Sequence, residues 1–190
     1  MKASWLTVKW KPFMASSKKA KGVFIAPQVL KGAFVVGASG GSGVLVVRDE
    51  KTGGWNGPAF YTIGGVSFGP QIGGQASEVV LLVMTERRVS SLLSNSLKLG
   101  ADVGIAAGPV GAGASVSTAN LSADILSFSR SKGLYGGVSV DGAVVAIRGD
   151  LNEAYYGKPV TPTDTLIRRQ VANPQAERLI DAVAKATARK

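Results

Sequence analysis

The amino-acid sequence predicts an α+β fold: a mainly antiparallel, strongly bent β-sheet, barrel- or sandwich-like, with flanking C-terminal helices. Three observations support this prediction. Glycine supplies 25 of the 190 residues, and the apolar residues are largely Val, Ile, Leu and Ala. Short apolar runs alternate with Gly-, Ser- and Asp-rich turns as far as Ile147, which is typical of antiparallel strands. After Ile147 this alternation stops and capped helical patterns follow.

The first strands are expected between residues 20 and 74. The apolar runs Ala33–Val36 and Val44–Val47 flank the Gly- and Ser-rich segment Gly37–Gly43, which we interpret as a hairpin loop. A polar turn, Arg48–Gly54, then leads to a third apolar run, Phe60–Val66. These runs predict an antiparallel meander.

The middle of the chain supplies further strands and one short helix. The uniformly apolar run Val79–Met84 predicts a strand buried on both faces, and Thr85 can cap a helix near 86–95. Leu97–Ile105 alternates apolar and polar residues, which predicts a half-buried strand. The remaining strands are predicted at Ala112–Ser117, Ile125–Arg130, Gly137–Val140 and Ala143–Ile147, the last two joined by a turn at Asp141-Gly142.

Helices are predicted near 162–170 and 174–188. Thr161-Pro162-x-Asp164 combines a cap residue, a proline at the first helical position and an early acid, and Asn173-Pro174 starts the second helix. Residues 1–19 are expected to be an N-terminal arm or a non-native remnant, because Pro12 disfavours a helix before it. Residues 20–190 are predicted to form a single domain, a length that can bury a real core.

The net charge of +10 is concentrated at the two ends of the chain. Residues 1–31 carry seven lysines and no acid, residues 32–157 have a net charge of −1, and residues 158–190 have +4. Such a field suits an anionic partner, but no basic segment is interleaved with stacking aromatics, so nucleic acid is not expected. The residues expected to contact an anionic phospholipid membrane surface are Lys18, Lys19, Lys21, Lys31, Arg168 and Arg169.

The composition argues against catalysis. Cysteine and histidine are both absent, which removes thiol nucleophiles, imidazole bases and ordinary zinc sites. Gly37–Gly41 matches G-x-S-x-G, but a nucleophile elbow needs a strand-to-helix turn and a histidine. Gly40–Gly43 could present backbone N–H groups to a phosphate, although a tight turn is the simpler interpretation. No enzyme activity, metal or cofactor is predicted.

Several short sequence motifs occur in the same order as in a known protein family. The motifs are Ala20-Lys21-Gly22, Lys31-Gly32, Gly40–Gly43 before a Val-rich strand, Trp55-x-x-Pro58, Gln71–Gly74, Ala107–Gly111, Ser129–Ser139 and Tyr155-Tyr156-Gly157. Together they resemble a SYLF domain of the bacterial type, a member of a family of lipid- and actin-binding modules. The resemblance covers most of the chain after residue 19.

The resemblance implies a non-catalytic module for anionic, phosphoinositide-like membrane surfaces. The alternatives that it implies are binding to actin filaments or another acidic protein, and a structural role in a bacterial cell envelope. Bacterial relatives commonly follow an export or lipid-attachment signal. The chain as written shows no leader and no apolar run of the ~20 residues that span a bilayer, so the cytoplasm, periplasm and outer membrane all stay open. No oligomeric state is predicted.

Overall fold

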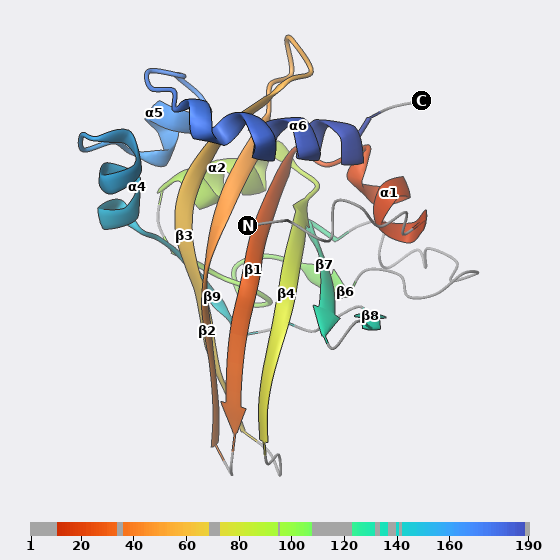
Figure 1. Ribbon diagram of the computed structural model, residues 1–190. Helices are drawn as coiled ribbons and strands as arrows, with labels where there is room; N and C mark the ends of the chain where they lie inside the picture. Colours follow the sequence, from red (N-terminus) through yellow and green to blue (C-terminus); the bar gives the residue numbers. More distant parts are fainter. Residues whose placement is uncertain are drawn as a thin grey trace.

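The computed structural model describes residues 11–33, 36–68, 73–94, 96–107, 123–131, 134–136, 140 and 142–188. Its centre is an open, strongly curled sheet of mostly antiparallel strands, close to a half-barrel, with helices packed along it (Figure 1). The predicted α+β class and bent, mainly antiparallel sheet are therefore confirmed. Residues 1–10, the strand predicted at Ala112–Ser117 and most of the one at Gly137–Val140 lie outside the described residues.

The helices and strands have the following bounds. They are α1 Lys11–Ser17, β1 Gly22–Ala33, β2 Val36–Arg48, β3 Trp55–Phe68, β4 Gly73–Val83, α2 Glu86–Ser94, β5 Leu97–Lys98, β6 Ile105–Ala107, β7 Ile125–Ser131, β8 Leu134–Gly136, β9 Val144–Ile147, α4 Gly149–Tyr156, α5 Pro162–Leu166, the 3-10 helix η2 Pro174–Ala176 and α6 Glu177–Ala186. Among the described strands, the order across the sheet is β5-β9-β3-β2-β1-β4-β7-β6, and β8 pairs with β7. β6 and β7 run parallel.

Four long neighbouring strands, β1 to β4, form the main part of the sheet. Each has 11 to 14 residues, or roughly 35–45 Å at about 3.3 Å per residue. The helices gather at one end of these strands, and the other end extends beyond them (Figure 1). We name residues 22–26, 43–48, 55–61 and 79–83 the helix-covered half, and residues 30–32, 38–42, 62–66 and 74–77 the bare half.

Alternating side chains of the helix-covered half build two hydrophobic cores, one on each face of the sheet. The α2 face, packed by α2 and α5, buries Phe24 and Leu45 among others. The α6 face, packed by α1 and α6, buries Val23, Val46 and Leu82. Because side chains alternate along a strand, most residues of a covered strand are buried on one face or the other.

β4 shows this two-sided burial most clearly. Residues 79 to 83 are all at most 6% exposed, as the uniformly apolar run predicted. The predicted helix near 86–95 is α2, which buries Val89 and Leu92. The strands predicted at Ile125–Arg130 and Ala143–Ile147 are β7 and β9, and β9 pairs with β3 and β5.

The C-terminal helices also match their predictions. Thr161 and Asp164 form a reciprocal capping box at the start of α5, and Asn173 caps η2, which leads directly into α6. α5 ends at Leu166, before the expected residue 170. No helix in the part of the chain that the structure describes is both long enough and apolar enough to cross a membrane.

The interpretation of Gly37–Gly43 as a hairpin loop is wrong. The segment lies inside β2, paired with β1 on one side and with β3 on the other. Glycine is required there for close approach: a Cβ on Gly41 would lie 2.3 Å from the Gln28 carbonyl oxygen, and one on Gly43 would lie 2.4 Å from the Phe24 ring. The pairing of β1 shifts register between Ile25 and Leu30, where proline cannot donate to the ladder.

The single strand predicted at Leu97–Ile105 is also wrong. β5 and β6 take its two ends, and a turn separates them. The Asp102 carboxylate accepts a 2.7 Å hydrogen bond from the Lys98 backbone N–H, and Gly100 has φ +85°. The apolar positions are nevertheless buried as the alternation indicated, because Leu97, Leu99 and Val103 all enter the α2-face core.

The helix α1 was not expected. Pro12 lies in its first turn, where a helix needs no N–H donor from the backbone. Phe13 packs edge-on against Phe128 with ring centroids 5.4 Å apart, and the Ser17 hydroxyl donates to the Ala186 carbonyl at 3.3 Å. α1 therefore packs on the sheet and on α6, although the domain boundary at residue 19 stays a prediction.

Candidate interaction surfaces

The six basic residues expected at a membrane surface occupy four separate places in the fold. Lys18 and Lys19 follow α1, Lys21 precedes β1 and Lys31 lies near the far end of β1. Arg168 and Arg169 follow α5. The structure brings some of these side chains to the helix-bearing end of the sheet, but it places Lys31 at the opposite end.

The first place is a corner between α1 and α6. The hydrogen bond from Ser17 to Ala186 joins the C-terminal ends of the two helices. Lys18 and Lys19 follow Ser17 in the chain, and Lys185 precedes Ala186 in the last turn of α6. Lys19 and Lys185 are exposed. Cations are also favoured at helix C-terminal ends because of the helix dipole. We name Lys18, Lys19 and Lys185 the basic corner.

Lys21 is engaged in ion pairs rather than available as a lone charge. Its ammonium contacts Glu50 and, at 3.2 Å, Glu86, and its side chain is 34% exposed. Hydrogen bonds to Glu50 and Glu86 raise the pKa of Lys21 above its usual value. The sequence could not show this pairing because the two glutamates lie 29 and 65 residues further along the chain.

Arg168 and Arg169 are paired with carboxylates as well. Arg168 contacts Asp164 at 3.1 Å, one turn before it, and Arg169 contacts Asp49 at 2.9 Å. Asp49 also closes the turn after β2 by accepting hydrogen bonds from two backbone N–H groups, those of Lys51 and Thr52. These bonds are the main reason that the pKa of Asp49 is lowered.

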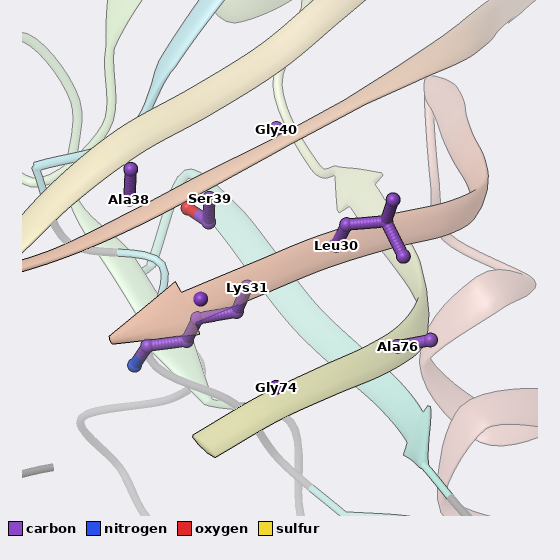
Figure 2. Close-up of a pocket in the computed structure, with 8 residues that line it drawn as sticks. Leu30, Lys31, Ala38, Ser39, Gly40, Gly74 and Ala76 are labelled. Atoms are coloured by element: carbon purple, nitrogen blue, oxygen red, sulfur yellow. The ribbon is translucent and has the colours of Figure 1, made fainter. Parts of the chain in front are cut away.

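Lys31 lies far from the other five cations. Ten residues of extended chain separate it from Lys21, which corresponds to about 30 Å. It lines a shallow groove of about 800 Å³ in the bare half (Figure 2). The other lining residues are Leu30, Gly32, Ala38, Ser39, Gly40, Gly74 and Ala76, from β1, β2 and β4.

The groove was missed at the sequence level because its glycines were interpreted as turn residues. The signal that could have revealed it is a period of two along β2, where Ala38, Gly40 and Ser42 alternate with residues of the opposite face. All three are exposed. A strand with small residues at every second position presents a smooth face.

The candidate nucleophile and metal motifs can also be placed. Ser39 lies inside β2, three residues after its start, and its hydroxyl donates to the Gly65 carbonyl at 3.4 Å, so it does not occupy a strand-to-helix turn. No group of three or more acidic, His or Cys side chains that could hold a metal ion occurs among the described residues.

Comparison with known proteins identifies relatives. The family model described as "Ysc84: Las17-binding protein actin regulator" matches residues 64–186. The chain is 36% identical over 168 residues to Protein YSC84 of Saccharomyces cerevisiae (86% of this chain, 35% of the relative). It is 35% identical over 149 residues to LAS seventeen-binding protein 3 of the same species (76% and 32%). It is 33% identical over 165 residues to human SH3 domain-containing YSC84-like protein 1 (86% and 48%). The chain thus spans about a third to a half of the length of these relatives.

Proposed function

Since the chain belongs to the Ysc84 (SYLF) family, whose model describes actin regulators, we propose that it is a non-catalytic module that binds an acidic protein surface. The actin filament is the first candidate for that surface. The observation that carries the proposal is the basic corner. Lys19 and Lys185 are exposed and have no ion-pair partner among the described residues, whereas Lys21, Arg168 and Arg169 are paired with carboxylates.

The distribution of charge supports binding by the corner. A chain with a net charge of +10 attracts an acidic surface from a distance. Ion pairs within the fold reduce the local field around Lys21, Arg168 and Arg169, so exposed lysines without such pairs contribute more of the attraction. Contacts of this kind act mainly on the association rate and on specificity, and salt weakens them over a Debye length of about 10 Å at 0.1 M.

The second candidate partner is an anionic, phosphoinositide-like membrane surface. Each Lys or Arg close to such a surface adds on the order of 1 kcal/mol. Residues 1–31 carry seven lysines and no acid, and the basic corner includes two of them. The same corner would therefore meet either an acidic filament or a phospholipid headgroup layer.

The test is sedimentation of the chain with actin filaments, with vesicles containing a phosphoinositide and with neutral vesicles, each at two salt concentrations. The variant carries Lys18→Glu, Lys19→Glu and Lys185→Glu. A matched control carries Lys51→Glu, Arg87→Glu and Lys158→Glu, which replaces exposed cations elsewhere. Both variants change the net charge from +10 to +4.

We expect the corner variant to lose sedimentation with actin filaments and the control to keep most of it. Equal losses in both variants would show that the overall charge, and not the corner, attracts the filament. Sedimentation with phosphoinositide vesicles but not with actin would replace the first candidate by the second. Turnover in an esterase, phosphatase and peptidase panel, abolished by Ser39→Ala, would contradict the non-catalytic assignment.

A further inference from the structure

The outer edge of β3 is paired along only part of its length. β9 pairs with residues 61–64 of β3, which continues to Phe68. The Arg148 N–H donates to the Phe60 carbonyl at the start of this ladder, at 3.0 Å. Because hydrogen-bonded residues alternate in an antiparallel pair, every second residue from Phe60 onward directs its backbone groups toward this edge. Val66 is the first of these residues beyond β9.

The chain leaves this edge just before β9 begins. Ala143, the residue before β9, lies over one face of the sheet, since a Cβ on Gly65 would lie 3.2 Å from the Ala143 Cα. Its N–H donates to the Val140 carbonyl. No described group pairs with the outward N–H and C=O of Val66, and its side chain is 67% exposed. We name residues 65–68 the open edge.

The same edge of β3 is closed near the helices. The Asn152 side chain accepts a hydrogen bond from the Phe60 N–H at 2.8 Å and donates one to the Phe60 carbonyl at 3.1 Å. Asn152 is fully buried there, and burying an amide is costly unless it is hydrogen-bonded. α4 thus supplies a side chain that satisfies the backbone of β3 at Phe60, whereas no described side chain does so at Val66.

The open edge also lacks the features that protect exposed strands. Natural sheets protect their edges with charged residues, proline or a β-bulge. Residues 64–68 are Gly-Gly-Val-Ser-Phe, without a charge or a proline. The pairing of β3 with β2 is regular here, because its register shift lies near the helices, between Leu45 and Val47. An unprotected edge of this kind is a template for another strand.

Val66 lies on the α6 face, continued past the helices. Residues opposite one another in a ladder point to the same side of the sheet. Val66 is opposite Ala38 and Leu30 is opposite Gly40, and both partners are an even number of residues from Val46 on β2. Val46 is completely buried in the core under α1 and α6. One continuous sheet face is therefore covered by helices at one end and uncovered at the other.

The side chains next to the open edge favour an apolar strand. Val144 lies diagonal to Val66 on the α6 face, because it is opposite Gly64, and it is 37% exposed. An added strand would lay apolar side chains against this pair. On the opposite face Ala143 lies close over Gly65, so the space there suits small side chains. The added strand is expected to alternate large apolar and small residues.

We infer that the open edge of β3 binds an extended segment of a partner protein as an added strand, in line with β9. The backbone of that segment pairs with the outward N–H and C=O groups of Val66 and Phe68. Its larger apolar side chains lie on the α6 face against Val66 and Val144. The open edge lies at the end of β3 that the helices leave uncovered, apart from the basic corner, so the inference goes beyond the proposed function.

Backbone groups, size and net charge distinguish this occupant from three others. A bilayer cannot satisfy backbone N–H and C=O groups, and a helix already uses its own groups internally. A second copy could offer its own open edge, but an edge of about four residues provides too little area for the roughly 1,000 Å² that a stable interface buries. Two chains with a net charge of +10 also repel each other. Strand addition by a short segment gains its affinity from main-chain hydrogen bonds instead.

The first test is selection of random ten-residue peptides, displayed on phage, against the full chain. Val66→Pro removes the outward N–H, and proline is tolerated at the edges of sheets. We expect recovered peptides to bind the unchanged chain at least tenfold more tightly than the folded Val66→Pro variant. Recovery of no peptide, or equal binding to this variant, would overturn the inference.

A recovered peptide then shows which of its backbone groups bind. N-methylation of one peptide residue at a time removes one N–H. Because the N–H groups of a strand point alternately to its two sides, methylation of every second residue should weaken binding at least tenfold. Methylation of the residues between them should have little effect. Sensitivity without this period of two would exclude an added strand.

Amide hydrogen exchange locates the site on the chain itself. In the free chain the Val66 amide should exchange faster than the amides of Thr62 and Gly64, which face β9. The bound peptide should slow exchange at Val66 at least tenfold. Protection of other residues with unchanged exchange at Val66 would place the site elsewhere.

Two further variants control for the fold and for nonspecific apolar binding. Val66→Lys keeps the N–H but places a charge at the edge, and it should weaken binding at least tenfold with an unchanged melting temperature. Ile167→Ser removes an apolar side chain that is 49% exposed elsewhere and should leave the affinity unchanged. Equal losses in both variants would exclude the open edge as the site. A concentration-dependent dimer that Val66→Lys abolishes would assign the edge to a second copy instead.

Discussion

Gly40 and Gly43 lie three residues apart on β2, yet their surroundings differ completely. A Cβ on Gly43 would lie 2.4 Å from the Phe24 ring and 2.8 Å from the Ile25 carbonyl oxygen, whereas a Cβ on Gly40 would meet nothing within 4 Å. Gly43 belongs to the helix-covered half and faces the α2-face core. Gly40 belongs to the bare half and faces outward. Glycine therefore leaves room for a buried ring in the helix-covered half, whereas in the bare half it leaves the surface of the sheet uncovered.

The comparison extends to the charges of the two halves. The carboxylates of Asp49, Glu50, Glu86 and Asp164 lie at the helix-bearing end, where they pair with Lys21, Arg168 and Arg169. In the described bare half the charged residue is Lys31. The helix-covered half thus carries the hydrophobic cores and much of the ion pairing, and the bare half contributes little to either.

The largest expected difference is between two glycine substitutions. Gly43→Val forces the new side chain into the Phe24 ring and the backbone of β1, and overpacking of this severity should lower the free energy of unfolding by about 3 kcal/mol or more. Gly40→Val should raise it by about 0.5–1 kcal/mol. Urea unfolding of both variants checks the pair. A loss of stability in Gly40→Val would mean that the floor of the groove is occupied by the chain itself.

A pair of leucines on the α6 face gives the next largest difference. Leu82 is fully buried under the helices, and Leu30 is 55% exposed. Leu82→Ala should cost about 2–5 kcal/mol of unfolding free energy, because it removes buried methyl groups and leaves a cavity. Leu30→Ala should change it by less than about 0.5 kcal/mol. Similar costs for both, measured by thermal unfolding, would contradict the division of this face into two halves.

The sequence predicted the helix-covered half better than the bare half. The apolar run Val79–Met84 predicted a buried strand, and Thr161 and Asp164 predicted a helix cap. Both predictions could be made because each feature depends on residues that are neighbours in the sequence. Glycine has no such single meaning. A turn, a close approach of two strands and an open floor all favour it, so Gly37–Gly43 could not be assigned from composition alone.

The candidate basic site shows a second limit. Lys21 and Lys31 are near each other in sequence, but an extended strand carries them about 30 Å apart. The basic corner instead includes Lys185, whose neighbour Ala186 is hydrogen-bonded to Ser17, the residue before Lys18 and Lys19. No local pattern could reveal that contact, because the Ser17–Ala186 hydrogen bond joins residues 169 positions apart.

Two lysines of the N-terminal segment provide a smaller test. Lys21→Glu would place a third carboxylate beside Glu50 and Glu86, and we expect it to lower the melting temperature by a few degrees, since repulsion among partly exposed charges costs on the order of 1 kcal/mol. Lys19 has no ion-pair partner in the described structure, so Lys19→Glu should leave the melting temperature unchanged. Equal melting temperatures for both variants in low salt would show that the Lys21 pairs contribute nothing to the fold.

The smallest expected difference between the two halves is the response of their local stability to low pH. Hydrogen bonds from Arg148 hold the pKa of Asp150 down to about 2, and the pKa values of Asp49 and Asp164 are lowered as well, mainly by hydrogen bonds from the Lys51 backbone and from Thr161 respectively. A carboxyl group whose pKa is lower in the folded state stabilises the fold above its unfolded value of about 3.9. That stabilisation is lost as the pH falls from about 4 toward 2.

Because these three carboxylates hold the turns and helices at the helix-bearing end, acid should loosen that end and spare the bare half, which has no carboxylate among its described residues. Hydrogen exchange at pH 3 and pH 6, corrected for intrinsic rates, should show lost protection in α4 and α5 and unchanged protection in residues 38–42. Asp150→Asn should reduce the change in α4, and loss of protection in residues 38–42 first would show that the two halves do not unfold separately.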